Sequence, residues 1–267
     1  STAILNLTIN QGDTSYTNIT ACDSAVWNGT TYNSSGTYYS SIGSNNNYSM
    51  SFDGSNDYID VSDNPSLPFG TGDFNISFKL KATNLEGGII NKYNYTGTNS
   101  TSNGFLVRLT STNLLFVFTD APNNNQHTTD ISAYLNNQWF DVSLNCTWGD
   151  MVRIYINSNL VDSFSMANIS GSLFANVPLA IGRAYYYSNF LGGNLDDVQI
   201  WDRTLNQQEI QQYMNCPPTG NESGLVGYWN FEEGSGTTTL DLSGNGNNGA
   251  INGATYDTNV PSQSCNL

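Results

Sequence analysis

The middle of the chain consists of short segments in which apolar and polar residues alternate. In Asp73–Lys81 the apolar residues fall at every second position, so they share one face of a strand. The strand-like segments that follow it are Gly88–Lys92, Phe105–Leu109, Leu114–Phe118, Trp139–Cys146, Met151–Ile156 and Leu160–Phe164. Strands at this regular spacing, with turn residues between them, are typical of an antiparallel sandwich and not of a parallel sheet. The predicted fold class is therefore all-β, an antiparallel β-sandwich.

One short helix is expected near residues 206–214. Asn206 is a residue type that caps helix N-termini, and Glu209 follows three positions later, as in a capping box. Ile210 and Tyr213 lie on the same side of this helix, so we expect that side to pack on the sandwich.

The charge balance limits the class of partner. The 267 residues carry 7 basic and 22 acidic side chains, a net charge of −15. Nucleic acid is excluded as a partner because no Lys/Arg cluster exists, and anionic membranes or sulfated glycans are disfavoured unless a cation bridges. The excess of Asp suits oxygen-ligated cations such as Ca²⁺, although a soluble acidic surface explains the charge as well. No apolar run approaches the roughly 20 residues of a membrane-inserted helix.

The four cysteines are Cys22, Cys146, Cys216 and Cys265. Their spacing does not resemble a zinc site, and an even count in a Thr/Asn-rich chain suggests disulfides and an oxidising compartment, secreted or at the cell surface. Cys216 and Cys265 flank the C-terminal segment, so we expect them to pair, which leaves Cys22 with Cys146 by elimination. The chain has no initiator Met and no signal peptide, so we expect a piece of a longer secreted protein.

Several motifs between residues 48 and 214 occur in one order. They are Phe52-Asp53-Gly54, Gly72-Asp73-Phe74, the hairpin from Val152 to Asn157, Ile181-Gly182-Arg183, and the acidic strand containing Asp196-Asp197 that runs into the helix. This order resembles the laminin G-like family, whose fold is a concanavalin A-like, pentraxin-like jelly roll. The resemblance implies one jelly-roll domain over residues 48–215 and a binding module rather than an enzyme.

The resemblance also implies a metal site, because the first and last strands of such a sandwich are brought together. Five oxygen-bearing residues on these strands would then converge on Ca²⁺: Asp53, Asn56, Asp57, Asp196 and Asp197. The alternative is that these side chains only shape turns and bind loop backbone. A second candidate, Asp241-x-Ser243-x-Asn245-Gly246, is similar to half of an EF-hand loop, but Asn252 stands where the bidentate Glu should be.

Aromatic, basic and amide residues in the expected loops are the candidate ligand-binding groups. They are Tyr185, Tyr186, Tyr187, Arg183, Lys92, Tyr93, Tyr95 and His127. Three adjacent tyrosines cannot all face one core, so at least one should be exposed and able to stack on a sugar ring. Loops on a rigid sandwich are where recognition usually lies. The alternative is that these are ordinary hydrated loops.

The two ends of the chain read differently from the middle. Residues 1–47 contain β-hairpin patterns that resemble tandem repeats of very large surface proteins of Bacteroidetes-type bacteria. In residues 216–267, Gly224–Phe231 and Asp241–Gly249 resemble strands that usually begin a laminin G-like domain. Either they complete the preceding sandwich, or they begin a second domain that is cut short. A disulfide around them favours an extension that packs on the jelly roll.

Catalysis is the least favoured interpretation. Concanavalin A-like sandwiches include glycoside hydrolases, which place paired carboxylates on one strand face. The chain has no Glu-x-Asp-x-x-Glu strand, and its single His has no nucleophile motif nearby. We therefore predict a non-catalytic, calcium-containing carbohydrate-binding module for a polysaccharide or glycan, a monomeric unit of a larger secreted or cell-surface protein. The alternative is an adhesin or spacer module that binds a protein or nothing.

Overall fold

The computed structural model describes residues 3–6, 18–21, 25–27, 30–32, 46–67, 69–95, 97, 102–184 and 189–265. The chain forms two compact units, Ser1–Asn45 with Gln263–Leu267, and Asn46–Ser262. In the first unit, β1 (Ala3–Asn6) pairs with β2 (Asn18–Ala21), and β3 (Ala25–Trp27) pairs with β4 (Thr30–Tyr32). Both pairs are antiparallel.

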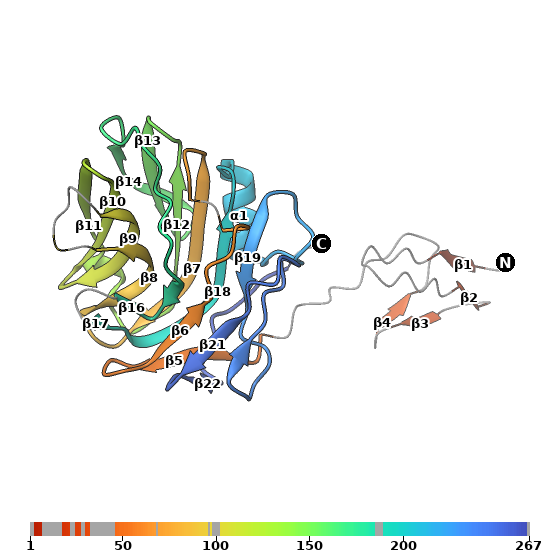
Figure 1. Ribbon diagram of the computed structural model, residues 1–267. Coiled ribbons are helices and arrows are strands. Elements are labelled where there is room, and N and C mark those ends of the chain that lie inside the picture. The colour runs from red at the N-terminus through yellow and green to blue at the C-terminus, as the bar shows by residue number, and fades with distance from the viewer. Residues whose placement is uncertain are drawn as a thin grey trace. The chain divides into compact units, whose positions relative to one another are not determined.

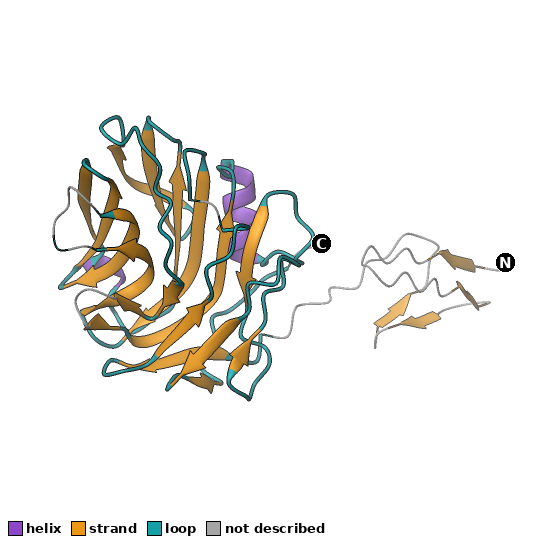
Figure 2. Cartoon of the chain, viewed as in Figure 1, coloured by secondary structure: helices purple, strands orange, loops and turns teal. Residues whose placement is uncertain are grey.

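The unit Asn46–Ser262 is an antiparallel sandwich, which confirms the predicted fold class. Among the described residues, the first sheet has the strand order β11-β10-β9-β8-β15-β6-β21-β20. The second sheet has the order β14-β13-β12-β7-β18-β5-β22, and β19 also pairs with β18. The two sheets form facing layers (Figure 1). In the described part of the chain, helical structure is confined to two short pieces, α1 (Gln207–Asn215) and a 3-10 turn at Ser132–Tyr134 (Figure 2).

The strands of the first sheet are short at one side and longer at the other. Their bounds are β6 (Tyr58–Val61), β8 (Glu86–Asn94), β9 (Asn103–Thr110), β10 (Asn113–Asp120), β11 (Asn124–Asp130), β15 (Leu179–Ile181), β20 (Thr238–Thr239) and β21 (Gly249–Asn252). Those of the second sheet are β5 (Ser49–Asp53), β7 (Phe74–Ala82), β12 (Phe140–Cys146), β13 (Met151–Ile156), β14 (Asn159–Ser165), β18 (Gly192–Trp201), β19 (Leu225–Trp229) and β22 (Thr255–Asp257). A small hairpin, β16 (Arg183–Ala184) with β17 (Asn189–Phe190), forms a separate two-stranded sheet.

The core lies between the two sheets and follows the predicted alternation. On β7 the side chains of Phe74, Ile76, Phe78 and Leu80 are all buried in one apolar cluster. Alternate residues of β9 and β10 enter the same cluster from the first sheet. The residues between them therefore point to the outer side of that sheet.

The C-terminal segment supplies strands to both sheets. β19 pairs with β18 through Val198 and Trp229, and β22 pairs with β5. β21 pairs with β6 of the first sheet through Ile59 and Ile251. The segment therefore completes the sandwich, the first of the two arrangements that the sequence left open.

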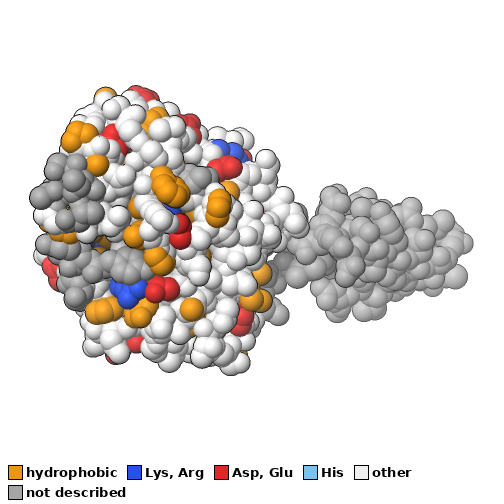
Figure 3. Space-filling model, viewed as in Figure 1, with side chains coloured by type: hydrophobic (Ala, Val, Ile, Leu, Met, Phe, Trp, Pro, Cys, Tyr) orange, Lys and Arg blue, Asp and Glu red, His pale blue; other side chains and the backbone are white. Residues whose placement is uncertain are grey.

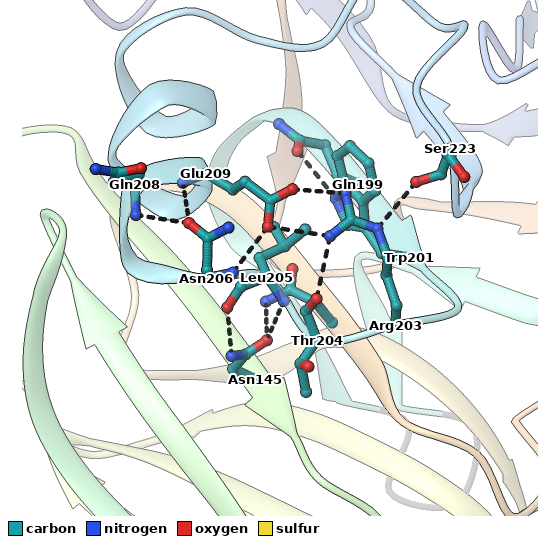
Figure 4. Close-up of polar contacts among 11 residues, drawn as sticks. Asn145, Gln199, Trp201, Arg203, Thr204, Leu205, Asn206, Gln208, Glu209 and Ser223 are labelled. Carbon is teal, nitrogen blue, oxygen red and sulfur yellow. Dashed lines mark hydrogen bonds and ion pairs between the residues drawn. The ribbon is translucent and has the colours of Figure 1, made fainter.

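Helix α1 (Gln207–Asn215) begins with the expected capping box. The Asn206 side chain accepts from the amides of Gln208 and Glu209, and the Glu209 carboxylate accepts from the Asn206 amide (Figure 4). Ile210 and Met214 bury one side of the helix against Trp201 on the outer side of the second sheet.

Within the described residues, no helix is long and apolar enough to cross a membrane.

The cysteines differ in part from the expectation. Cys216 and Cys265 are both disulfide-bonded. Cys146, at the end of β12, is a free thiol that is fully buried with its Sγ 3.1 Å from Sδ of Met166. The predicted bond between Cys22 and Cys146 is therefore wrong, and Cys22 itself lies outside the described residues. Burial raises the pKa of the Cys146 thiol, so it is an unreactive core residue.

Candidate functional site

The outer side of the first sheet, here called the outer face, is separate from the sandwich core. It carries a small apolar cluster of Tyr93, Leu106, Val117 and Ala184, with Tyr95 and Leu115 packed at its edge. The second sheet has its outer side covered by α1, whereas the outer face is crossed only by a short hairpin among the described elements. In the view of Figure 3, charged side chains are few and lie among hydrophobic and uncharged polar ones.

The hairpin β16–β17 lies against β8 because two glycines make room for it. A Cβ atom added at Gly88 would lie 2.1 Å from the carbonyl carbon of Arg183. A Cβ atom added at Gly87 would lie 2.5 Å from the carbonyl oxygen of Phe190. No side chain fits at either position, so the Gly87-Gly88 pair fixes where the hairpin, and with it Arg183, sits on the outer face.

Arg183 is the most organised of the predicted ligand-binding residues. Its Nη2 donates to both carboxylate oxygens of Asp60 at 2.8 Å, and its guanidinium carbon lies 3.5 Å from the ring centre of Tyr58. The Tyr58 ring in turn lies 6.3 Å from that of Phe190. A half-buried guanidinium is thus held flat between a carboxylate and aromatic rings, which fixes its plane.

Tyr93 and Tyr95 share the outer face with Arg183. Their ring centres are 6.1 Å apart, and the hydroxyl of Tyr95 donates to the carbonyl of Gly97 at 2.9 Å. Tyr93 is largely buried in the apolar cluster, whereas Tyr95 is half-buried. The structure therefore brings three predicted ligand-binding residues onto one surface. Tyr185, Tyr186 and Tyr187, predicted with them, lie outside the described residues.

Lys92 is not on this surface, which corrects one prediction. It is opposite Phe105 in the β8–β9 register, so it points to the core side and is fully buried. Its Nζ donates to Asp63 and to the carbonyl of Val177, at 2.7 Å for the carbonyl. Lys92 therefore joins strands inside the sandwich and does not meet ligand.

His127 also has a structural position. It belongs to β11 and not to a loop, opposite the core residue Phe116. Its ring stacks on Phe164 of the second sheet at 4.3 Å between ring centres, and its Nε2 lies 2.8 Å from Oδ2 of Asp162. Thr129 donates to the same oxygen. His127 thus closes the edge between β11 and β14, away from Arg183.

The two acidic segments do not converge, which corrects the predicted calcium site. In the β5–β18 register Asp53 is opposite Gly192, four residues from Asp196, or about 13 Å along the strand. Asp53 accepts from the amides of Ser55 and Asn56, and Asp57 accepts from the amide of Asp53. These carboxylates shape a turn, and Asn56 is exposed.

Asp196 and Asp197 form a buried pair of their own. A register shift in β18 gives Asp197 a φ of 48° and places both side chains inside the protein. Asp196 accepts from the side-chain amide of Asn46 at 2.9 Å, and Asp197 accepts from the hydroxyl of Tyr228 at 3.0 Å. Burial, and next the charge of Asp197, raise the pKa of Asp196 well above its ordinary value.

Asp196→Asn should change how stability depends on pH. Because the folded-state pKa of Asp196 is raised, its stabilising contribution is complete at low pH and is lost as the pH rises above about 4, where the unfolded chain ionises first. Asparagine does not ionise, so the variant should gain free energy of unfolding relative to wild type as the pH rises. Denaturant titrations between pH 4 and 8 measure this difference, and a constant difference would contradict it. Lys79, opposite Asp196 in the register, lowers this pKa and limits the gain.

The half EF-hand pattern is a structural turn. The Asp241 carboxylate accepts from the backbone amides of Tyr228, Ser243 and Asn247. These bonds occupy the oxygens that a calcium ion would need. Across the described ranges, no group of three or more His, Cys, Asp or Glu side chains could hold a metal ion.

Polar side chains that sequence reasoning missed lie where β9, β10 and β11 meet, on both sides of the first sheet. Asn103 is opposite Asp120, and Thr119 is opposite Asn124. The buried Oδ1 of Asn103, Oγ1 of Thr119 and Oδ1 of Asn124 have no hydrogen-bond partner. The Asp120 carboxylate accepts from the amides of Asn123, Ser170 and Gly171, which lower its pKa against the effect of burial. By strand alternation Thr119 and Asn124 point to the outer side of the sheet, as Val117 does, whereas Asn103 and Asp120 point to the core side. Only the pairing of these strands, which the sequence does not reveal, places Thr119 beside Asn124.

Comparison with known proteins agrees with this architecture. Residues 52–211 match a model described as Laminin_G_3, concanavalin A-like lectin/glucanases superfamily. Botulinum neurotoxin type E of Clostridium butyricum is 29% identical over 62% of this chain, and that of Clostridium botulinum is 30% identical over 61%. The chain spans only 13% of the length of these toxins.

Three solved structures share the fold. A proposed carbohydrate binding protein from Bacteroides ovatus has a TM-score of 0.60 at 19% identity, covering 81% of this chain and 61% of its own. An SAP-like pentraxin from Limulus polyphemus has a TM-score of 0.55 at 15% identity, covering 83% and 98%. The binding domain of Paraclostridial Mosquitocidal Protein 1 has a TM-score of 0.52 at 21% identity, covering 62% and 43%. With its family match extending over more than half of the residues, the chain belongs to the concanavalin A-like lectin/glucanases superfamily as a laminin G-like jelly roll.

Proposed function

We propose that this chain is a non-catalytic carbohydrate-binding module and that it binds glycan on the outer face. The observation that carries the proposal is Arg183, whose guanidinium is held by Asp60 and lies 3.5 Å from the ring of Tyr58. Pre-organised polar groups beside aromatic rings are what a small polar ligand with apolar ring faces requires. The arrangement offers both on one surface.

The chemistry of a sugar matches the groups present. A pyranose ring has apolar C–H faces that can lie on an aromatic ring such as Tyr95, and hydroxyls that accept from or donate to planar groups. Gln126 and Thr128 on β11 add exposed amide and hydroxyl groups to the outer side of the same sheet. Binding should be weak at each site and increase through multivalency if the parent protein carries several such modules.

The names of the related proteins are consistent with binding rather than catalysis. The Bacteroides ovatus protein is described as a proposed carbohydrate binding protein, and the mosquitocidal structure is a binding domain. A second candidate is a module that attaches to a protein partner, because the mosquitocidal structure is named only as a binding domain. We place the module outside the cell, as a monomeric unit of a secreted or surface protein, because it contains a disulfide.

Affinity electrophoresis tests the proposal directly. The complete chain migrates through native gels that contain one dissolved polysaccharide each, and binding retards it relative to bovine serum albumin. We expect retardation by at least one polysaccharide, suppressed by free oligosaccharide of the same sugar. If a broad panel of plant, algal, microbial and host glycans gives no retardation, the lectin proposal fails and the protein-binding candidate takes its place.

We also propose that calcium, if this module holds it, binds near Thr119 and Asn124, which are opposite each other on β10 and β11, rather than between the two acidic segments. Buried oxygens without hydrogen-bond donors are costly unless water or a cation meets them. The amide carbonyl of Asn124 and the hydroxyl of Thr119 are oxygen types that Ca²⁺ takes as ligands.

Calcium should then raise the thermal stability of the chain. At a free Ca²⁺ concentration about 100 times the dissociation constant, binding adds about 2.7 kcal/mol to the free energy of unfolding, because only the folded state binds the ion. Differential scanning fluorimetry with Ca²⁺ or with chelator measures the shift, and Thr119→Val is the matched variant, similar in shape but without the hydroxyl. A calcium-dependent shift that Thr119→Val reduces supports the site. An equal melting temperature with and without millimolar Ca²⁺ would show that these oxygens meet only water.

A further inference from the structure

We propose that the outer face selects neutral glycans and rejects acidic ones. This inference rests on the proposed carbohydrate-binding function and adds the class of ligand. It follows from the pairing of charges on that face rather than from the net charge of the whole chain.

Among the described residues, two basic side chains lie on the outer face, Arg183 and Arg108. Each of them is paired with a carboxylate of the same face. The Nη2 of Arg183 donates to both carboxylate oxygens of Asp60, each at a distance of 2.8 Å. Arg108, on β9, lies 3.2 Å from Glu86 on the neighbouring strand β8. The surface therefore displays planar guanidinium groups whose charge is already balanced.

Asp60 is a fixed part of this surface and not a mobile counter-ion. It lies in β6 between Ala180 of β15 and Ala250 of β21, so its backbone is paired on both sides. Ile59 and Val61 on either side of it are fully buried in the core, which directs the Asp60 side chain outward. An acidic sugar at Arg183 would thus meet a carboxylate that cannot move away.

The other basic residues cannot supply a free positive charge to the outer face. The chain has only seven Lys and Arg residues. Lys92 points to the core and donates to Asp63. The remaining four, Lys79, Lys81, Arg153 and Arg203, lie on the second sheet or beside the helix that covers it.

The energetics follow from these placements. Binding an anion at Arg183 requires either breaking the Arg183–Asp60 pair or placing two negative charges close together. A neutral sugar meets neither cost, because it can bind beside the Arg183–Asp60 pair while the ion pair stays intact. At a net charge of −15 the long-range field adds to the rejection of polyanions.

Matched pairs of polysaccharides test the inference. We would compare fully methyl-esterified with de-esterified homogalacturonan, and hyaluronan with its carboxyl-reduced form, by affinity electrophoresis of the complete chain at low salt. In each pair the backbone is the same and only the charge differs. We expect the neutral member to bind at least about tenfold more tightly wherever either member binds.

Asp60→Asn is the variant that separates charge from shape. It keeps an oxygen that accepts from Arg183 and leaves the guanidinium charge unbalanced, so it should raise the affinity for acidic glycans by about tenfold and make that affinity sensitive to salt. Leu160→Ala, at an exposed apolar residue on β14 of the second sheet, is the control and should change neither preference. Circular dichroism before binding checks that both variants fold.

The outcomes distinguish this inference from the function it rests on. If no glycan in the panel of either charge binds, the proposed function fails. If acidic glycans bind wild type as well as or better than their neutral partners, the proposed function stands and the charge preference is overturned. Acidic binding that requires calcium and disappears with chelator would overturn it in the same way, by showing a bridging ion.

Discussion

Trp229→Ala should lower the free energy of unfolding of the unit Asn46–Ser262 by about 3–5 kcal/mol. Trp229 is among the largest fully buried side chains of the described residues. Its Nε1 donates to the carbonyl of Asn247 at 2.9 Å, which ties β19 to the loop that precedes β21. The variant loses this bond and leaves a cavity that the surrounding β-strands cannot close.

The measurement is urea unfolding followed by tryptophan fluorescence, with a melting curve beside it. The expected loss corresponds to a decrease of roughly 6–20 °C in melting temperature for a domain of this size. Leu240→Ala in the same C-terminal segment is the control, because Leu240 is 47% exposed and should cost little. A loss below about 1 kcal/mol for Trp229→Ala would mean that the C-terminal segment is not part of the folded core.

Arg183→Ala should weaken glycan binding by about 30-fold, the effect of removing a central binding residue. The variant loses the planar donors of the guanidinium and the ring contact with Tyr58, and it leaves Asp60 without this partner. Arg183→Lys keeps the charge but not the flat, forked geometry, so it should recover only a small part of the affinity. Isothermal titration with the oligosaccharide found by electrophoresis measures both variants.

Arg203 provides a closely matched control. Its guanidinium pairs with Glu209 at 2.9 Å and lies 5.2 Å from the ring centre of Trp201, an arrangement much like that of Arg183 (Figure 4). It lies at the start of α1, on the side of the second sheet that the helix covers. Arg203→Ala should therefore leave glycan affinity unchanged. If both arginine variants lose affinity equally, the loss reports general destabilisation rather than contact with the ligand.

The sequence predicted the fold well because the fold depends on local patterns. Alternation on β7 and the capping box at Asn206 and Glu209 each involve only a few neighbouring residues. Each of the strand motifs is likewise short, and their order along the chain identified the fold. The sequence narrowed the position of the C-terminal strands to two arrangements but could not decide between them. The deciding contacts, β19 with β18 and β22 with β5, join strands through pairing that no local pattern reveals.

The candidate site was predicted only in part, for reasons of register and strand parity. Asp53 and Asp196 lie on paired strands, but four positions of register separate them. Lys92 follows a bulge in β8 that changes which face its residues occupy, so its direction cannot be read from alternation. His127 lies in a strand of amides and hydroxyls, whose lack of apolar residues hid both the strand and its buried face.

The most direct test of the central claim is hydrogen exchange measured by mass spectrometry with and without a saturating oligosaccharide. The account predicts protection in the segments that form the outer face, namely β6, β8, β9 and the β16–β17 hairpin. It predicts no change in α1 or in β13, which lie on the opposite side of the sandwich. Protection at α1, or unchanged exchange throughout at saturation, would contradict binding on the outer face.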